Sequence, residues 1–250
     1  MKNWKVYIVT HKNIKPEYYS IDKDFNNDNW GIINVSNKKL NDLSLYNNYD
    51  VIDMFNLPEY KMLGSWYAEM EAIYNIYVNK IHDKYDYIGF IHHDYQLKSI
   101  KGETDITHQI NNAIKFYDLI YFSTCVCDYH QNILADVDKP NMLQGDGINC
   151  YDYIINDYNQ FYNKNENVND WKNNIPKNIC SASLYNREIF NEMMKFLSCI
   201  IESGKLNIFD TEHKYRIQGG LLERYISVFL DKLNKPYYDL ELNHLYKENK

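Results

Sequence analysis

The order of helix-like and strand-like segments is the feature that most limits the fold of this chain. Apolar residues recur at helical spacing from Leu63 to Ile81, and the run "DYIGFI" (86–91) predicts a buried strand. A second helix is predicted in "DITHQINNAIKFYD" (105–118), and another strand in "DLIYFSTCV" (118–126). Because such alternation is typical of a mainly parallel sheet flanked by helices, we predict an α/β fold.

Both ends of the chain continue this pattern. Further strands are predicted in three apolar runs, at residues 5–12, 30–36 and 178–185. Further helices are predicted in three segments, at residues 150–162, at 186–204 with Asn186 as N-cap, and at 219–234. Residues 128–177 are rich in Asn, Asp and Tyr and resemble an irregular insertion around the first of these helices. With no Pro/Gly/Ser-rich linker in 250 residues, we expect a single domain over residues 1–250.

Charge and hydropathy exclude several classes of function. The formal net charge is −7, and the 27 Lys and Arg residues are scattered, so nucleic acid is not an expected partner. The N-terminus carries an apolar run of only about five residues, too short for a secretory signal, and no run approaches the roughly 20 apolar residues of a membrane span. We therefore expect a cytoplasmic protein with no intrinsic membrane segment.

Two predicted strands end in polar residues, and ligands of parallel sheets bind beyond the carboxyl ends of strands. These residues are Thr10, His11 and Lys12 after the first strand, and His92, His93 and Asp94 after "DYIGFI". A carboxylate and an imidazole two residues before it can take two positions of an octahedral cation such as Mn²⁺. Alternatively, His92 and His93 are ordinary strand-end residues and Asp94 caps a turn.

Four segments carry a resemblance to a known family. "YAEMEAIYNIYVN" (67–79) followed by "DYIGFIHHDY" (86–95) resembles the paired signature of a capsular-polysaccharide-type glycosyltransferase family, E-L-T-A-x-Y-x-x-W-K-N before D-Y-I-G-x-x-H. "KVYIVTHK" (5–12) resembles the opening strand of that family, and "RIQGGLLERYISVFL" (216–230) resembles its closing Gly-x-x-x-Glu-Arg helix. The matching positions are Glu69, Ala72, Tyr74, Asn79, Asp86, Tyr87, Ile88, Gly89, His92, Gly219 or Gly220, Glu223 and Arg224.

The chain departs from the family directly after His92. The family continues with Tyr-Arg-Arg, whereas this chain has His93, Asp94 and Tyr95, which is similar to the F-L-H-x-D strand end of other GT-A glycosyltransferases. The resemblance implies an element like D-x-D, in which His92 replaces the first Asp, and which binds Mn²⁺ or Mg²⁺ and the diphosphate of a nucleotide sugar. Asp94 is the first candidate ligand and His92 the second. We expect His93 to point to the other side of the strand.

The resemblance also implies a GT-A-like arrangement of the chain, with a nucleotide-sugar-binding half (1–127) and an acceptor-side half (128–250). Thr10 and His11 would then contact the base or ribose. Lys12 would contact a phosphate, although a solvated strand end explains it equally well. On the helical projection Glu69 lies on the flank of the apolar face and could reach a cleft, whereas Glu71 points away and is expected to be solvated.

Glu223 is the candidate catalytic residue. Inverting sugar transfer needs a carboxylate that removes the proton of the acceptor hydroxyl while a metal ion stabilises the departing diphosphate. We place Glu223 in the first turn of the last helix, where the helix dipole alone would also favour an acidic residue. Arg224 is a candidate phosphate contact, and His213 is a candidate third metal ligand that gains weight if the enzyme is retaining.

The resemblance thus implies a metal-assisted glycosyltransferase of polysaccharide biosynthesis. Its partners would be a nucleotide-sugar donor and a hydroxyl acceptor on a glycan, a lipid-linked glycan or a protein. The alternative is a non-catalytic GT-A-like module that binds nucleotide or carbohydrate. That alternative draws on the imperfect D-x-D and on the absence of the Arg-Arg pair after His92.

Overall fold

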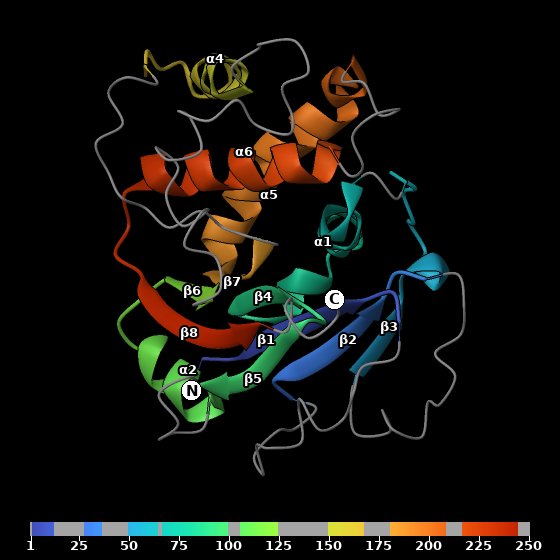
Figure 1. The fold of residues 1–250 in the computed structure, drawn as a ribbon, viewed down its shortest axis with the longest axis vertical. Helices are drawn as coiled ribbons and strands as arrows, with labels where there is room; N and C mark the ends of the chain where they lie inside the picture. The colour runs from blue at the N-terminus through green and yellow to red at the C-terminus, as the bar shows by residue number, and fades with distance from the viewer. Residues whose placement is uncertain are drawn as a thin grey trace.

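The computed structural model describes residues 2–12, 28–36, 50–64, 67–99, 106–124, 150–167, 181–208 and 217–244. Within these ranges eight strands form one mixed sheet, and helices cover both of its faces (Figure 1). The α/β prediction is therefore confirmed.

The sheet has the strand order β3-β2-β1-β4-β7-β6-β8-β5. The strands are β1 (Trp4–Thr10), β2 (Trp30–Asn34), β3 (Asp50–Asp53), β4 (Tyr87–His92), β5 (Tyr95–Ser99), β6 (Leu119–Thr124), β7 (Ser183–Asn186) and β8 (Tyr238–His244). Strands β3, β2, β1 and β4 are mutually parallel, as are β6 and β8, whereas β7 and β5 are antiparallel to their neighbours. The sheet is thus mainly parallel. Sequence patterning had not predicted β3, β5 or β8.

The helices form two layers of unequal depth. They are α1 (Glu69–Val78), α2 (Ile106–Ala113), α4 (Cys150–Tyr162), α5 (Arg187–Glu202) and α6 (Ile217–Leu233), with short 3-10 turns η3 (Met54–Asn56), η5 (Ile81–Lys84) and η8 (Lys205–Ile208). In Figure 1, α1, α5 and α6 lie over one face of the sheet, with α4 outside α6, and α2 lies on the opposite face. Among these described helices none is long and apolar enough to cross a membrane.

Strand β1 shows how the two faces are built. Tyr7 and Val9 belong to the core beneath the larger helical layer, whereas Val6 and Ile8 belong to the core on the α2 side. Successive side chains of a strand point to opposite faces, so a strand buried on both faces must be apolar at nearly every position. This register also fixes which face the residues following β1 can reach.

The helix predicted over Leu63–Ile81 is shorter than expected, because α1 begins only at Glu69. The preceding residue, Ala68, has φ 53°, which a right-handed helix cannot continue. Asn75 binds the upstream segment in a non-helical form: its side chain accepts a hydrogen bond from Lys61 N (2.7 Å) and donates one to Lys61 O (2.8 Å). The apolar spacing of the sequence therefore extends upstream of the residue at which the helix begins.

Glu71 is a second correction on this helix, since it is buried rather than solvated. Its carboxylate accepts hydrogen bonds from the Tyr60 hydroxyl (2.7 Å) and from Leu63 N (3.3 Å). Residues upstream of α1, Tyr60 and Leu63, therefore contact this side chain. Glu71 thus has a structural partner that a helical projection could not reveal.

The C-terminal helices match their predicted positions with one shift. Asn186 caps α5 as expected, because its side chain accepts a hydrogen bond from Ile189 N (2.8 Å). Helix α6 begins at Ile217, before Gly219, so Glu223 lies in the second turn and not in the first. A Cβ atom on Gly219 would lie 3.0 Å from Ala68 Cβ and 3.0 Å from Tyr67 O. Glycine therefore permits the close packing of α6 against the start of α1.

Candidate active site

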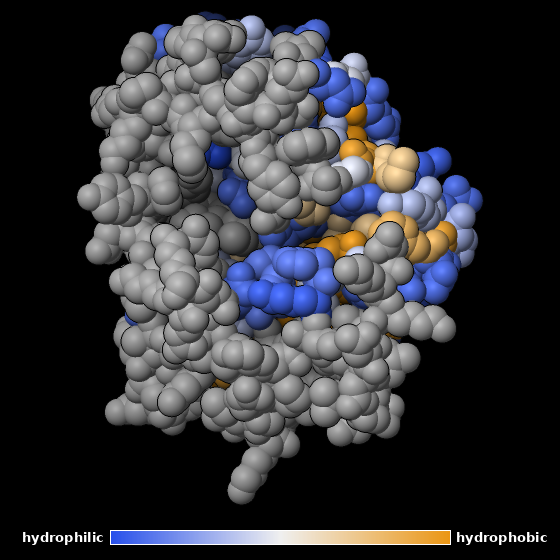
Figure 2. Space-filling model, turned by 45° about the vertical axis from the view of Figure 1, so that its right-hand side comes forward, coloured by the Kyte–Doolittle hydropathy of each residue, from blue (hydrophilic) through white to orange (hydrophobic). Residues whose placement is uncertain are grey.

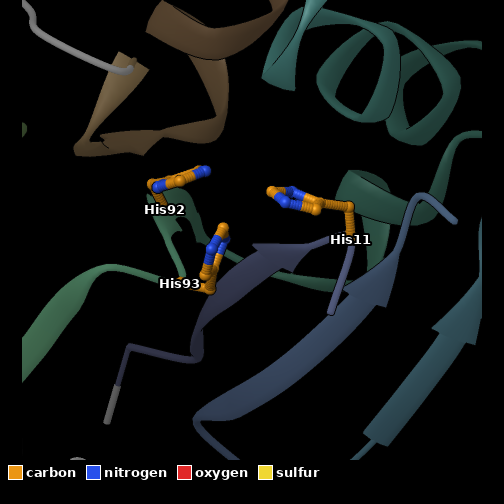
Figure 3. A group of neighbouring side chains, drawn as sticks. All are labelled: His11, His92 and His93. Carbon is orange, nitrogen blue, oxygen red and sulfur yellow. The ribbon is translucent and has the colours of Figure 1, made fainter. Parts of the chain in front are cut away.

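Parallel pairing of β1 and β4 brings their polar ends together. Val9 is in register with His92, and Val9 faces the core beneath α1. His11 follows Val9 by two residues, so it emerges on the same side of the sheet as His92. Figure 3 shows His11, His92 and His93 with their rings turned toward one another at these strand ends.

The three imidazoles form a compact group. Ring centroids lie 3.9 Å apart for His92 and His93, 4.7 Å for His11 and His93, and 6.3 Å for His11 and His92. One ring nitrogen from each residue lies within 4.8 Å of the others. His92 and His93 are buried, whereas His11 is exposed. The group is thus open to solvent on the His11 side.

The position of His93 contradicts the expectation that its side chain points away. Strand β4 ends at His92, and the backbone N–H of His93 donates to Val9 O (3.1 Å) as the chain enters a turn. Strand alternation no longer applies at that point, so adjacent histidines can face the same site. The sequence signal for His93 was its place next to His92, but the exact end of the strand decides where it points.

Asp94 lies against both buried histidines. Its Oδ2 atom is 3.2 Å from His92 Nδ1, and its Oδ1 atom is 3.1 Å from His93 Nε2. Lys12 Nζ approaches Oδ1 at 3.6 Å from the exposed side. The hydrogen bonds from His92 and then His93 hold the pKa of Asp94 well below its usual range, so the carboxylate is ionised at neutral pH.

For His93, burial has a larger effect on the pKa than the hydrogen bond to Asp94 has. Burial lowers the pKa of His93 to about 4, and the nearby Asp94 carboxylate only partly opposes this shift. The ring is therefore neutral at neutral pH. Neutral imidazole is the form that binds a metal ion.

Glu69 adds a second carboxylate to the cluster. It is the first residue of α1, its side chain is buried, and its Oε1 atom lies 3.3 Å from His92 Nε2. The His92 ring therefore lies between two carboxylates, Glu69 and Asp94. The amino end of a helix favours a negative charge at this position.

Thr10 and Lys12 shape the loop after β1. The buried Thr10 hydroxyl accepts a hydrogen bond from Lys12 N (3.1 Å) and donates one to Lys12 O. Its polar atom is thus used within the loop, which makes Thr10 a support for the turn. The Lys12 ammonium is half-exposed beside Asp94 and is available to a further anion.

Helix α6 contacts the start of α1 through Gly219. Gly219 packs against Tyr67 and Ala68, immediately before Glu69, and Glu223 follows Gly219 by one helical turn with a half-buried side chain. Arg224 is buried, and its Nη1 atom donates to Gly220 O (2.6 Å). The remaining candidate, His213, lies outside the described residues.

The donor atoms at the strand ends fit a divalent cation. Two carboxylates supply negative charge, and three imidazoles supply nitrogen ligands. Carboxylate oxygen suits Mg²⁺ and Mn²⁺ alike, whereas imidazole suits transition metals better than Mg²⁺. Figure 2 shows a hollow on one face of the molecule, and the described residues at its margin include hydrophilic ones.

No family model matches the chain, and no curated protein matches it. Among solved structures it is similar to the WbbM bifunctional glycosyltransferase in its apo form, with a TM-score of 0.61 and 15% identity over 98% of this chain and 46% of WbbM. It is also similar to the mannosyltransferase Ktr4p from S. cerevisiae, with a TM-score of 0.34 and 12% identity over 89% of this chain and 66% of Ktr4p. The chain thus spans about half the length of WbbM. Together with the mainly parallel sheet, the similarity to WbbM shows a GT-A-like fold.

Proposed function

We propose that this chain is a glycosyltransferase that moves a sugar from a nucleotide-sugar donor to a hydroxyl group of a glycan or other acceptor. The observation that carries the proposal is the cluster of His11, Glu69, His92 and Asp94 at the carboxyl ends of β1 and β4. In open α/β sheets this edge is where ligands bind. The GT-A-like fold supports the same class of reaction.

The cluster has the charges needed at a diphosphate site. A divalent cation, Mn²⁺ or Mg²⁺, held by His92 and Asp94 would neutralise the charge of the departing nucleoside diphosphate. Lys12 lies on the exposed side and would contact a phosphate oxygen, and His11 would lie against the ribose or base. Asp94 and Glu69 hold the His92 ring between them and fix its orientation.

Glu223 is our proposed general base for an inverting displacement. The acceptor oxygen forms a bond to the anomeric carbon, and its proton passes to the Glu223 carboxylate. The bond from that carbon to the diphosphate oxygen breaks, and its electron pair leaves with the nucleoside diphosphate. Glu223 is half-buried on α6, one turn beyond the contact of Gly219 with the start of α1. Its place in the second turn also means that the helix dipole does not by itself account for an acid there.

The resemblance to the capsular-polysaccharide-type family supports a role in polysaccharide biosynthesis. Under this proposal the acceptor is a hydroxyl on a growing glycan, on a lipid-linked glycan or on a protein.

Release of nucleotide from a panel of UDP-, GDP- and dTDP-sugars, with candidate hydroxyl acceptors and with Mn²⁺ or EDTA, tests the proposal. We expect release from one donor in the presence of Mn²⁺, and a sugar-bearing product by mass spectrometry. Asp94→Asn should lower release at least tenfold, whereas His108→Ala, at an exposed histidine on α2, should not. Nucleotide binding without release from any donor and acceptor would contradict the proposal.

The second candidate is a non-catalytic module that binds nucleotide or carbohydrate. One observation favours it: both Asp94 oxygens already lie against His92, His93 and Lys12. For this candidate we expect calorimetry to detect nucleotide binding that Glu223→Gln leaves unchanged, without sugar transfer. Sugar transfer that Glu223→Gln abolishes would exclude it.

A further inference from the structure

We propose that His11, His92 and His93 form a metal site of three imidazoles, which binds Zn²⁺ or another nitrogen-preferring transition ion in preference to Mg²⁺. In this arrangement Asp94 orients the rings and is not itself the principal ligand. The inference rests on the proposed function for what the ion does in sugar transfer, and it replaces the ligand pair of His92 and Asp94, and the ion Mn²⁺ or Mg²⁺, that are given there. Ion binding itself can be measured without a sugar donor.

The spacing of the rings fits one ion. A nitrogen from each histidine lies within 4.8 Å of the others. Zn–N bonds of about 2.1 Å place two nitrogens of a tetrahedral site roughly 3.4 Å apart, so only a small movement is needed. His11 is exposed and follows the last residue of β1, so its ring can rotate toward the two buried rings.

The contacts of Asp94 determine which nitrogens face the ion. Its two oxygens lie against His92 Nδ1 and His93 Nε2. A carboxylate that accepts a proton from one ring nitrogen leaves the lone pair on the other nitrogen, which is the usual arrangement behind a metal-bound histidine. His92 Nε2 and His93 Nδ1 are therefore the assigned ligand atoms, and a single carboxylate orients both rings.

Glu69 is placed to assist from the opposite side. Its Oε1 atom lies 3.3 Å from His92 Nε2, the nitrogen assigned to the ion. That separation is close to the distance expected between two ligands of one tetrahedral ion. The carboxylate can thus neutralise part of the ion's charge.

Donor chemistry sets the selectivity. Mg²⁺ requires near-octahedral oxygen ligands, whereas imidazole suits Zn²⁺, Co²⁺ and Ni²⁺, and Mn²⁺ is the weakest of this series. Three protein nitrogens also leave at least one coordination position open. With the Glu69 and Asp94 carboxylates and the Lys12 ammonium nearby, a bound dication leaves the site with a net positive charge, which suits a phosphate oxygen as the outer ligand.

The test uses the full chain stripped of metal with EDTA, without any nucleotide sugar. Calorimetry with Zn²⁺, Co²⁺, Mn²⁺ and Mg²⁺ should show a Zn²⁺ and Co²⁺ site with an affinity at least 100-fold above that for Mg²⁺. Bound Co²⁺ should give visible absorption bands typical of tetrahedral or five-coordinate nitrogen ligation. His11→Ala is the decisive variant because His11 is exposed, so its loss should not disturb folding, and we expect at least tenfold weaker Co²⁺ binding with altered bands.

Two further variants separate ligand from positioning roles. Asp94→Asn should weaken Co²⁺ binding about 10- to 100-fold, as orienting partners of metal ligands do, while the positions of the Co²⁺ bands stay the same. His108→Ala should change neither affinity nor spectrum, since His108 is an exposed histidine on a different element. Mg²⁺ binding as tight as Zn²⁺ binding, or a Co²⁺ spectrum unchanged by His11→Ala, would overturn the site. Intact Co²⁺ binding without any sugar transfer would instead count against the proposed function alone.

Discussion

The carboxylate of Glu69, the first residue of α1, lies 3.3 Å from Nε2 of His92, the last residue of β4. This contact joins a helix and a strand at the edge of the sheet where the parallel strands β1 and β4 end. Both side chains are buried, so neither the charge nor the ring is easily reoriented.

Glu69→Gln should lower nucleotide release without unfolding the protein. The substitution keeps the size of the side chain but removes the negative charge that faces His92. We expect about a 10- to 100-fold lower kcat/KM for the nucleotide sugar, the range seen when an orienting partner is lost, and little change in Tm. Steady-state kinetics and a thermal melt measure the two effects, and wild-type kcat/KM would show that the contact has no part in the reaction.

Glu71→Ala should lower the stability of the protein and leave nucleotide release unchanged. Glu71 lies on the same helix but accepts hydrogen bonds from Tyr60 and Leu63 N, away from the histidine cluster. Removing a buried acceptor leaves those donors without their partner, so we expect a loss of about 2 kcal/mol in the free energy of unfolding. Urea denaturation measures it. A stability equal to that of the wild type would mean that water replaces the carboxylate without cost.

Gly219→Ala should disturb the packing of α6 on α1. The added Cβ atom would lie 3.0 Å from Ala68 Cβ and from the backbone oxygen of Tyr67, which cannot move aside as a flexible side chain can. We expect a loss of about 1–3 kcal/mol in stability, typical of overpacking, together with lower nucleotide release as Glu223 shifts with the helix.

Gly220→Ala is the matched control, because this neighbouring position is half-buried and alanine favours a helix over glycine. Urea midpoints that fall equally for both variants would argue against a specific contact at Gly219.

Asp231→Asn should stabilise the protein at neutral pH. Burial raises the pKa of Asp231, against the opposing charge of Lys232, whose Nζ atom lies 4.0 Å away. Since the folded pKa lies above the unfolded value of 3.8, the stability that this group contributes is present below that value and is lost as pH rises through the folded pKa. The Asn variant should therefore have the larger free energy of unfolding at pH 7. The difference should shrink when urea denaturation is repeated below about pH 4, and a difference independent of pH would contradict the assignment.

Local patterning found those helices and strands whose apolar spacing or caps are visible in a short window. The helix at Cys150–Tyr162 and the cap of α5 at Asn186 follow directly from such signals. The start of α1 does not, because Leu63 continues the apolar spacing while Asn75 holds the preceding segment in a non-helical form. Strand β5 was missed for a related reason. It is held at the end of the sheet by pairing with β8, which lies far away in the sequence.

Some residues of the candidate site could also be found from local patterns, and others could not. The sequence by itself placed His11, His92 and Asp94 at strand ends, because short apolar runs end where polar residues begin. The contact of Glu69 with His92 and the inclusion of His93 depend on the tertiary structure. They require the parallel register of β1 with β4, the packing of α1 over that edge, and the turn that begins directly after His92. Side chains far apart in sequence meet only when these pairings fix their directions, and no local pattern carries that information.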